Sequence, residues 1–253
     1  MTAIEVTHLV KRYRGATRNA VDDISFTVDS GEFCCLLGPN GAGKTTTISI
    51  LTTTLERTSG EARIAGRDVG ADQAGVRREI GVVFQQPALD QNLTAEENLR
   101  LHAVLYGMFS WRPLHRWMPA AYRTLVQDVA GVLGMAELLG RPVRSLSGGQ
   151  RRRLEIVRAL MHRPRVLFLD EPTAGLDPQS RRSLWSHLGE TRTRNGTTIV
   201  LTTHYLEEAE SADAVCVLTH GRITERGTPA EIKSRHASPT LEEAYLTMLG
   251  NPS

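Results

Sequence analysis

The sequence predicts an α/β fold whose central strands are parallel. Short apolar runs at residues 33–37 and 166–169, and a run of aliphatic residues and threonines at 197–203, have the length of strands that are buried on both faces. The first run ends in a glycine-rich turn that leads into a helical pattern, as in a strand–turn–helix unit. A block of helical pattern over residues 88–160 is inserted into this otherwise strand-rich chain.

Size and composition limit the classes of protein to which this chain can belong. With 253 residues and 40% hydrophobic content, the chain can form one large α/β domain or two small ones. No run of 18 apolar residues is present, and residues 1–10 include Glu5 and lack a signal-peptide core, so we expect a cytoplasmic location. Three cysteines, two of them adjacent, indicate buried reduced thiols. A net charge of +2 is too balanced to indicate nucleic-acid binding.

The first 32 residues have the pattern of β structure. Alternation predicts strands at 4–7 and 24–28, followed by a turn at 29–31. Tyr13 lies between these strands in the polar stretch 11–15. Two roles fit this position, stacking on a nucleotide base or packing within its own hairpin, and the local pattern favours neither.

The glycine-rich turn fits the phosphate-binding loop pattern G-x-x-x-x-G-K-[ST] and precedes a helix predicted over 45–55. Glycine permits positive φ, so successive backbone N–H groups can point into one concavity at the positive end of a helix. Lys44 is placed to reach the β- and γ-phosphates, and the Thr45 hydroxyl to bind Mg²⁺. The chain has only three lysines, which argues against a chance match. The predicted loop consists of Gly38, Pro39, Asn40, Gly41, Ala42, Gly43, Lys44, Thr45 and Thr46.

A polar side chain follows a later strand. After a turn at 58–60, strands are predicted at 62–66 and 81–84, and Pro87 prevents the second from continuing past Gln85 and Gln86. Ligands of open α/β sheets bind where strands end. Gln85 is therefore a candidate to bind Mg²⁺ or to hold an attacking water, although a lone glutamine after a strand is weak evidence.

The helical block begins with a capping box from Thr94 to Glu97, which predicts a helix to about residue 107. Trp111 and Trp117 then lie in a basic, proline-containing segment at 110–119, which is either a packed loop or a docking edge for a partner protein. An amphipathic helix is predicted over 120–133.

A second capping box, from Ser147 to Gln150, begins a helix whose apolar positions continue to residue 161. Gly148 and Gly149 leave its first N–H groups uncovered, which makes a second anion site. Two phosphate-facing sites in one chain suggest that ATP is held between two copies. Residues 151–153 are all arginine and are predicted to form a solvated face.

Two acids, Asp170 and Glu171, end the apolar run that begins at residue 166. Unpaired buried charge is costly, so this pair predicts a site in which Asp170 holds Mg²⁺ and Glu171 acts as general base toward water. A tight loop follows at 174–178. His204 ends the next apolar strand and can donate to a γ-phosphate or serve as a structural histidine. Strands at 214–218 and 222–224, a short helix after 227–231, and an amphipathic helix at 241–246 complete the chain.

The order of these motifs closely resembles that of the ATP-binding subunits of ABC transporters, over essentially the whole chain. The Ser-Gly-Gly-Gln sequence at 147–150 is the most specific part, because it separates this family from other phosphate-loop ATPases. The resemblance implies a RecA-like P-loop NTPase core with an antiparallel β subdomain and an inserted α-helical subdomain at about 88–160. These would form an ATP-binding domain over residues 1–237, followed by a C-terminal amphipathic tail at 238–253.

The resemblance also implies partners and residue roles. Two subunits would close head to tail on two ATP molecules, as a homodimer or pseudo-dimer, and an integral membrane permease would dock in the groove beside Gln85. No nucleic acid is expected. The implied catalytic residues are Glu171, His204 and Gln85, and the implied Mg²⁺ ligands are Thr45, Gln85 and Asp170. The implied nucleotide contacts are Tyr13, the loop at 38–46, Ser147, Gly148, Gly149, Gln150 and Asp177.

Segments 20–26 and 239–246 resemble those of ABC-2-type exporters such as the daunorubicin-resistance drug pumps. We therefore expect the motor of a small-molecule exporter (of a drug, antibiotic, lipid or polysaccharide), peripheral at the cytoplasmic face of a bacterial membrane. The tryptophan-containing segment departs from that pattern and leaves the membrane partner open. The alternatives are an importer ATPase, a soluble ABC ATPase acting on DNA or ribosomes, and a cassette that binds ATP without hydrolysing it. The last is disfavoured by the presence of both Glu171 and His204.

Overall fold

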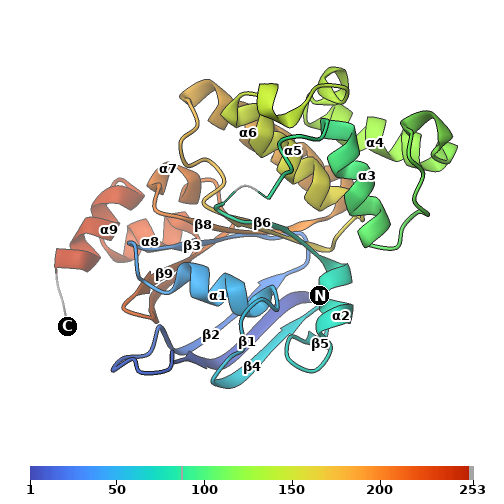
Figure 1. Ribbon diagram of the computed structural model, residues 1–253. Helices are drawn as coiled ribbons and strands as arrows, with labels where there is room; N and C mark the ends of the chain where they lie inside the picture. Colours follow the sequence, from blue (N-terminus) through green and yellow to red (C-terminus); the bar gives the residue numbers. More distant parts are fainter. Residues whose placement is uncertain (87, 251–253) are drawn as a thin grey trace.

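The computed structural model describes residues 1–86 and 88–250, which form a layered α/β fold (Figure 1). The central layer is a six-stranded sheet in the order β10-β9-β3-β8-β7-β6. Its first five strands along the chain are mutually parallel and β10 is antiparallel to β9, so the predicted parallel sheet is confirmed. The strands are β3 (Phe33–Leu37), β6 (Ile80–Val83), β7 (Val166–Asp170), β8 (Thr198–Thr203), β9 (Ala214–Thr219) and β10 (Arg222–Gly227).

A separate antiparallel sheet has the order β2-β1-β4-β5. Its strands are β1 (Thr2–Lys11), β2 (Val21–Asp29), β4 (Ser59–Ile64) and β5 (Arg67–Asp68). The turn predicted at 58–60 is wrong in part, because Ser59 already pairs with Val10 at the start of β4. Gly60 fits within that strand only as glycine, since a Cβ there would lie 2.1 Å from the His8 carbonyl oxygen.

Helices cover both faces of the central sheet (Figure 1). The predicted helices are confirmed with small changes of boundary, and α2, α6 and α7 are additional to the prediction. The α-helices are α1 (Lys44–Leu51), α2 (Gln73–Glu79), α3 (Ala95–Leu105), α4 (Ala120–Val132), α5 (Gly148–Leu160), α6 (Pro178–Asn195), α7 (Leu206–Ala209), α8 (Pro229–Arg235) and α9 (Leu241–Gly250). Short 3-10 helices are η1 (His115–Trp117), η2 (Ala136–Leu138) and η3 (Val143–Ser145).

The core consists of two clusters, one on each face of the central sheet. Phe33, Cys35 and Leu37 of β3 pack with residues of α3, α4 and α5. The alternate residues Cys34 and Leu36 pack with α1 and the antiparallel sheet. Because successive side chains of a strand point to opposite faces, a strand covered on both sides must be apolar throughout, which explains the continuous runs in the sequence.

The last helices pack onto the domain. Leu241 and Ala244 of α9 are buried in the cluster that contains α3 to α5. Within the described ranges, no helix is both long and apolar enough to cross a bilayer. The predicted effect of Pro87 on β6, and residues 251–253 of the predicted tail, lie outside the described residues.

Candidate functional site

The glycine-rich turn joins β3 to α1 in a conformation that requires glycine at two positions. Gly43 has φ +105°, and a Cβ there would lie 2.5 Å from the Ala20 carbonyl oxygen. A Cβ on Gly38 would lie 2.3 Å from the Leu218 carbonyl oxygen. Among the described residues, the run 40–45 has one backbone N–H with a hydrogen-bond partner, that of Ala42, which donates to Pro39. The remaining N–H groups of this run have no hydrogen-bond partner among the described residues, and they lie at the start of α1, where a helix attracts anions.

Lys44 is the first residue of α1 and is only 5% exposed. Its Nζ donates to the carbonyl oxygens of Gly38, at 2.6 Å, and Pro39, at 3.0 Å. Burial lowers the pKa of Lys44, while the nearby carboxylates of Glu171 and Asp170 act in the opposite direction. The Lys44 ammonium is thus held by two carbonyl oxygens of its own loop, and the oxygens of a phosphate could replace them as acceptors.

Asp170 and Glu171 lie at the end of β7, beside this loop. Asp170 is 2% exposed, accepts a hydrogen bond from the Thr202 hydroxyl, and has its Oδ1 3.3 Å from the Thr45 hydroxyl. Glu171 has φ +46°, a left-handed backbone that costs a non-glycine residue about 1–2 kcal/mol. Its N–H donates to the Thr202 carbonyl at 3.0 Å, which fixes this conformation.

Three residues predicted to act in hydrolysis meet at the Glu171 carboxylate. Gln85 Nε2 donates to Glu171 Oε2 at 3.1 Å, and His204 Nδ1 lies 3.2 Å from Oε1. Gln85 follows β6 and His204 follows β8, the strands on either side of β7. Glu171 and Gln85 also line a cavity of about 500 Å³ together with Ala20 and the loop residues 40–46. The structure therefore brings together side chains that are far apart in the sequence.

Tyr13 lies near the same loop, after β1. Its hydroxyl is 3.4 Å from the Thr46 hydroxyl, and the residue is 46% exposed rather than packed inside a hairpin. The Lys11 ammonium lies 5.4 Å from the ring centroid. This arrangement leaves a ring face available beside the phosphate loop, as the stacking interpretation requires.

The second predicted anion site is separate within one chain. Ser147 caps α5 in a complete capping box with Gln150, and Ser147 and Gly148 are exposed. Asp177 caps α6, and hydrogen bonds from Ser180 lower its pKa. Neither Ser147 nor Asp177 is among the described residues that line the cavity at the phosphate loop. Gly149 has a packing role of its own, because a Cβ there would lie 2.8 Å from Ser180 Oγ.

Arg152 corrects one prediction. It was expected on a solvated face with its neighbours, but it is only 7% exposed. Its guanidinium donates to the carbonyl oxygens of Phe84 (2.6 Å), Asp170 (2.9 Å) and Pro172 (2.8 Å), and pairs with Glu155 at 3.0 Å. Arg152 therefore ties α5 to the ends of the two strands that carry Gln85 and Glu171. The i,i+3 spacing of Arg152 and Glu155 is visible in the sequence, but Arg151 stands at i,i+4 from the same glutamate, so spacing alone does not single out Arg152.

Comparison with known proteins agrees with this geometry. A family model described as ABC transporter matches residues 21–174. The chain belongs to the ABC transporter family. It is similar to the daunorubicin/doxorubicin resistance ATP-binding protein DrrA of Streptomyces peucetius, with 41% identity over 94% of this chain and 69% of that protein. It is also 39% identical to the Nod factor export ATP-binding protein I of Ralstonia nicotianae, over 96% of this chain and 72% of the relative.

Solved ABC ATPases share the fold. One, described as the ATP-binding subunit of an ABC transporter, superposes with a TM-score of 0.83 at 30% identity, over 98% of this chain and 99% of that one. Another, a dimeric ATP-binding cassette in a post-hydrolysis state bound to ADP and Pi, has a TM-score of 0.77 at 26% identity and covers 89% of this chain and 98% of its own. The RecA-like ABC ATPase fold, and ATP binding and hydrolysis as the activity of the family, are thereby confirmed for this chain.

Proposed function

We propose that this chain is the ATP-hydrolysing motor of an exporter, working with a membrane permease at the cytoplasmic face of the membrane. The relatives named for drug resistance and for Nod factor export support a small-molecule cargo. The cargo would contact the permease, a separate chain, so this domain contributes ATP-driven motion. The observation that carries the proposal is the Glu171 carboxylate, held between Gln85 and His204 at the edge of the phosphate-loop cavity.

Each group has a proposed task in hydrolysis. The free N–H groups of the loop and the Lys44 ammonium bind the β- and γ-phosphates. Glu171 accepts a proton from the attacking water, and Gln85 and His204 hold its carboxylate in place. His204 Nδ1 lies 3.2 Å from Glu171 Oε1 and donates to that carboxylate; in the imidazolium form the opposite ring nitrogen also carries a proton and donates to the γ-phosphate. Tyr13 stacks on the adenine.

The residues present fit a Mg²⁺ ion. Thr45, Gln85 and Asp170 offer a hydroxyl, an amide carbonyl and a carboxylate, which are the oxygen ligands that Mg²⁺ prefers. The Thr45 hydroxyl and the Asp170 carboxylate are already 3.3 Å apart. The chemistry supplied by the bound ion is neutralisation of charge on the phosphate oxygens.

We infer that a second copy, or a close relative in a pseudo-dimer, completes the site. In one chain the tip of α5, with Ser147 and Gly148 exposed and Gly149 partly buried, does not line the cavity at the loop. The start of a helix 13 residues long attracts anions, so this tip, with Gln150 and Asp177, would cover the triphosphate bound by the other copy. Differential affinity of ATP for the closed dimer would then drive the cycle.

Glu171→Gln tests the proposal. The amide keeps the shape of the side chain but cannot accept a proton, so the rate of ATP hydrolysis should fall by about 10²–10⁴-fold. ATP binding, measured with a fluorescent analogue, should persist, and ATP-dependent dimers should accumulate in gel filtration. Glu242→Gln, at an exposed position on α9, is the control and should hydrolyse ATP normally. Wild-type hydrolysis by Glu171→Gln would show that another group is the base. Lack of hydrolysis by the wild type would favour the alternative in which the cassette binds ATP without hydrolysing it.

A further inference from the structure

An exposed apolar surface lies between α3 and α4. Six of the ten large hydrophobic side chains that are exposed in the described residues fall within positions 101–117. Leu105 is 75% exposed, Trp111 and Trp117 are each 55% exposed, and Leu114 is 41% exposed. We name residues 105–119 the tryptophan segment. It forms the green edge of the helical layer between α3 and α4 (Figure 1).

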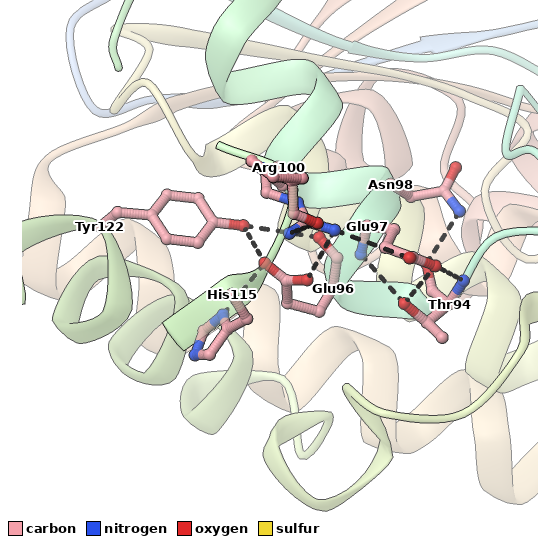
Figure 2. A network of polar contacts seen from close by, with 8 residues as sticks. Thr94, Glu96, Glu97, Asn98, Arg100, His115 and Tyr122 are labelled. Atoms are coloured by element: carbon pink, nitrogen blue, oxygen red, sulfur yellow. Dashed lines mark hydrogen bonds and ion pairs between the residues drawn. The ribbon is translucent and has the colours of Figure 1, made fainter. Parts of the chain in front are cut away.

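The backbone of the tryptophan segment is held from beneath by a polar network (Figure 2). Arg100, which is 3% exposed, donates to the Pro113 carbonyl at 2.9 Å. Glu96 accepts from the Tyr122 hydroxyl at 2.8 Å and pairs with His115 at 3.0 Å. These bonds tie the segment to α3 and α4, so the exposed rings project from a fixed frame.

The exposed charged side chains of the tryptophan segment are all basic. Residues 98–127 contain no aspartate or glutamate. Arg112 and Arg116 are exposed, and the Arg116 guanidinium lies 5.6 Å from the Trp117 ring centroid. The Arg100 guanidinium lies 5.4 Å from the Trp111 ring centroid, on the inner side. An apolar, aromatic and uniformly basic surface is thus presented to the outside.

We propose that the tryptophan segment binds the headgroup layer of an anionic membrane. Tryptophan and arginine are the residues that favour the boundary between lipid and water, and basic side chains are attracted to anionic lipids. In this arrangement Trp111, Trp117 and Leu114 lie among the headgroups, and Arg112 and Arg116 face lipid phosphates. The exposed arginines require an anionic occupant, and an anionic headgroup layer offers negative charge over its whole surface. The inference adds a direct lipid contact to the proposed function, in which the permease alone holds the chain at the membrane.

The test uses the full chain and lipid vesicles without permease or nucleotide. We expect cosedimentation with vesicles of phosphatidylglycerol and phosphatidylcholine, much weaker binding to pure phosphatidylcholine, and loss of binding at high salt. Arg112→Gln with Arg116→Gln should weaken binding by about 25-fold, or fivefold for each arginine. Trp111→Ser with Trp117→Ser should weaken it by at least about tenfold. The matched control, Arg63→Gln with Arg194→Gln, removes two exposed arginines elsewhere and should bind within about twofold of wild type.

Several outcomes would overturn the inference. These are absence of binding by the wild type, equal binding to both kinds of vesicle, or unchanged binding in both double variants. The surface would then be assigned to a protein partner. Thermal unfolding and ATP hydrolysis are measured for each variant, so that a failure of the lipid contact can be distinguished from a failure of the motor function. Neither the two tryptophans nor the two arginines line the phosphate-loop cavity, so hydrolysis should be unchanged in the variants. Loss of vesicle binding with normal hydrolysis supports the lipid contact, whereas normal vesicle binding without hydrolysis contradicts only the motor function.

Discussion

Replacing Arg152 by alanine should destabilise the chain by about 4 kcal/mol. The change leaves Glu155, which is 3% exposed, without its partner, and breaking a buried ion pair in this way costs about 3–5 kcal/mol. Glu155 retains one hydrogen bond, from the Ala88 N–H at 2.8 Å, which keeps the loss below the upper end of that range. The carbonyl oxygens of Phe84, Asp170 and Pro172 also lose a donor. For a domain of this size, about 4 kcal/mol corresponds to a melting temperature lower by about 8–16 °C.

Urea unfolding followed by circular dichroism measures this loss, and calorimetry measures the shift in melting temperature. Arg151→Ala is the matched control, because the Arg151 side chain makes no hydrogen bond to any described residue, and it should change stability by no more than about 0.5 kcal/mol. The double variant Arg152→Met with Glu155→Met removes both charges and should recover part of the loss. If Arg152→Ala unfolds like Arg151→Ala, the contacts of Arg152 do not stabilise the fold and the reasoning is refuted.

Two further predictions concern Lys44 and His102. Lys44→Ala should weaken ATP binding by about 10–100-fold, since a charge-assisted contact contributes about 1.5–3 kcal/mol. The control Lys233→Ala should bind ATP in titrations as the wild type does. Equal ATP affinities of the two variants would contradict the role of Lys44 in the phosphate loop. Burial lowers the pKa of His102 to about 3, and His162 and Arg158 act in the same direction. The unfolded chain takes up the proton near pH 6.5, so folded-state stability is fully present above that pH and falls by roughly 2 kcal/mol between pH 6.5 and 5. His102→Gln should flatten this pH dependence in urea titrations, and an unchanged slope would refute the assignment.

The site was predictable where one short pattern, or the end of one strand, determines it. The phosphate loop is encoded in nine consecutive residues, and Asp170 with Glu171 ends a run that is recognisable by itself. The meeting of Gln85, Glu171 and His204 followed because parallel strands end at one edge of a sheet. The left-handed backbone of Glu171 could not be predicted, because it depends on the contact with Thr202 in the neighbouring strand.

Elements were missed where apolar residues are sparse. Helix α6 buries only Leu184, Leu188 and Thr191, a narrow stripe with i,i+4 and i,i+7 spacing in an otherwise polar sequence. Arg152 was misassigned for a related reason. Three consecutive arginines look alike in sequence, but the position of Arg152 on α5 directs it to the sheet, where three carbonyl oxygens accept from it. Tertiary packing, rather than local propensity, distinguishes it from its neighbours.

Helix α5 connects the two halves of the proposed nucleotide site. Ser147 at its tip is exposed, whereas Arg152, five residues later and about 7.5 Å along the axis, binds the backbone next to Gln85 and Glu171. The tip of α5 therefore cannot move without also moving Arg152. Such a movement would change the hydrogen bonds that Arg152 donates to the carbonyl oxygens of Phe84 and Asp170. Loosening α5 should therefore impair hydrolysis as well as stability. Arg152→Ala, assayed well below its melting temperature, should hydrolyse ATP more slowly than Arg151→Ala even though neither arginine lines the cavity.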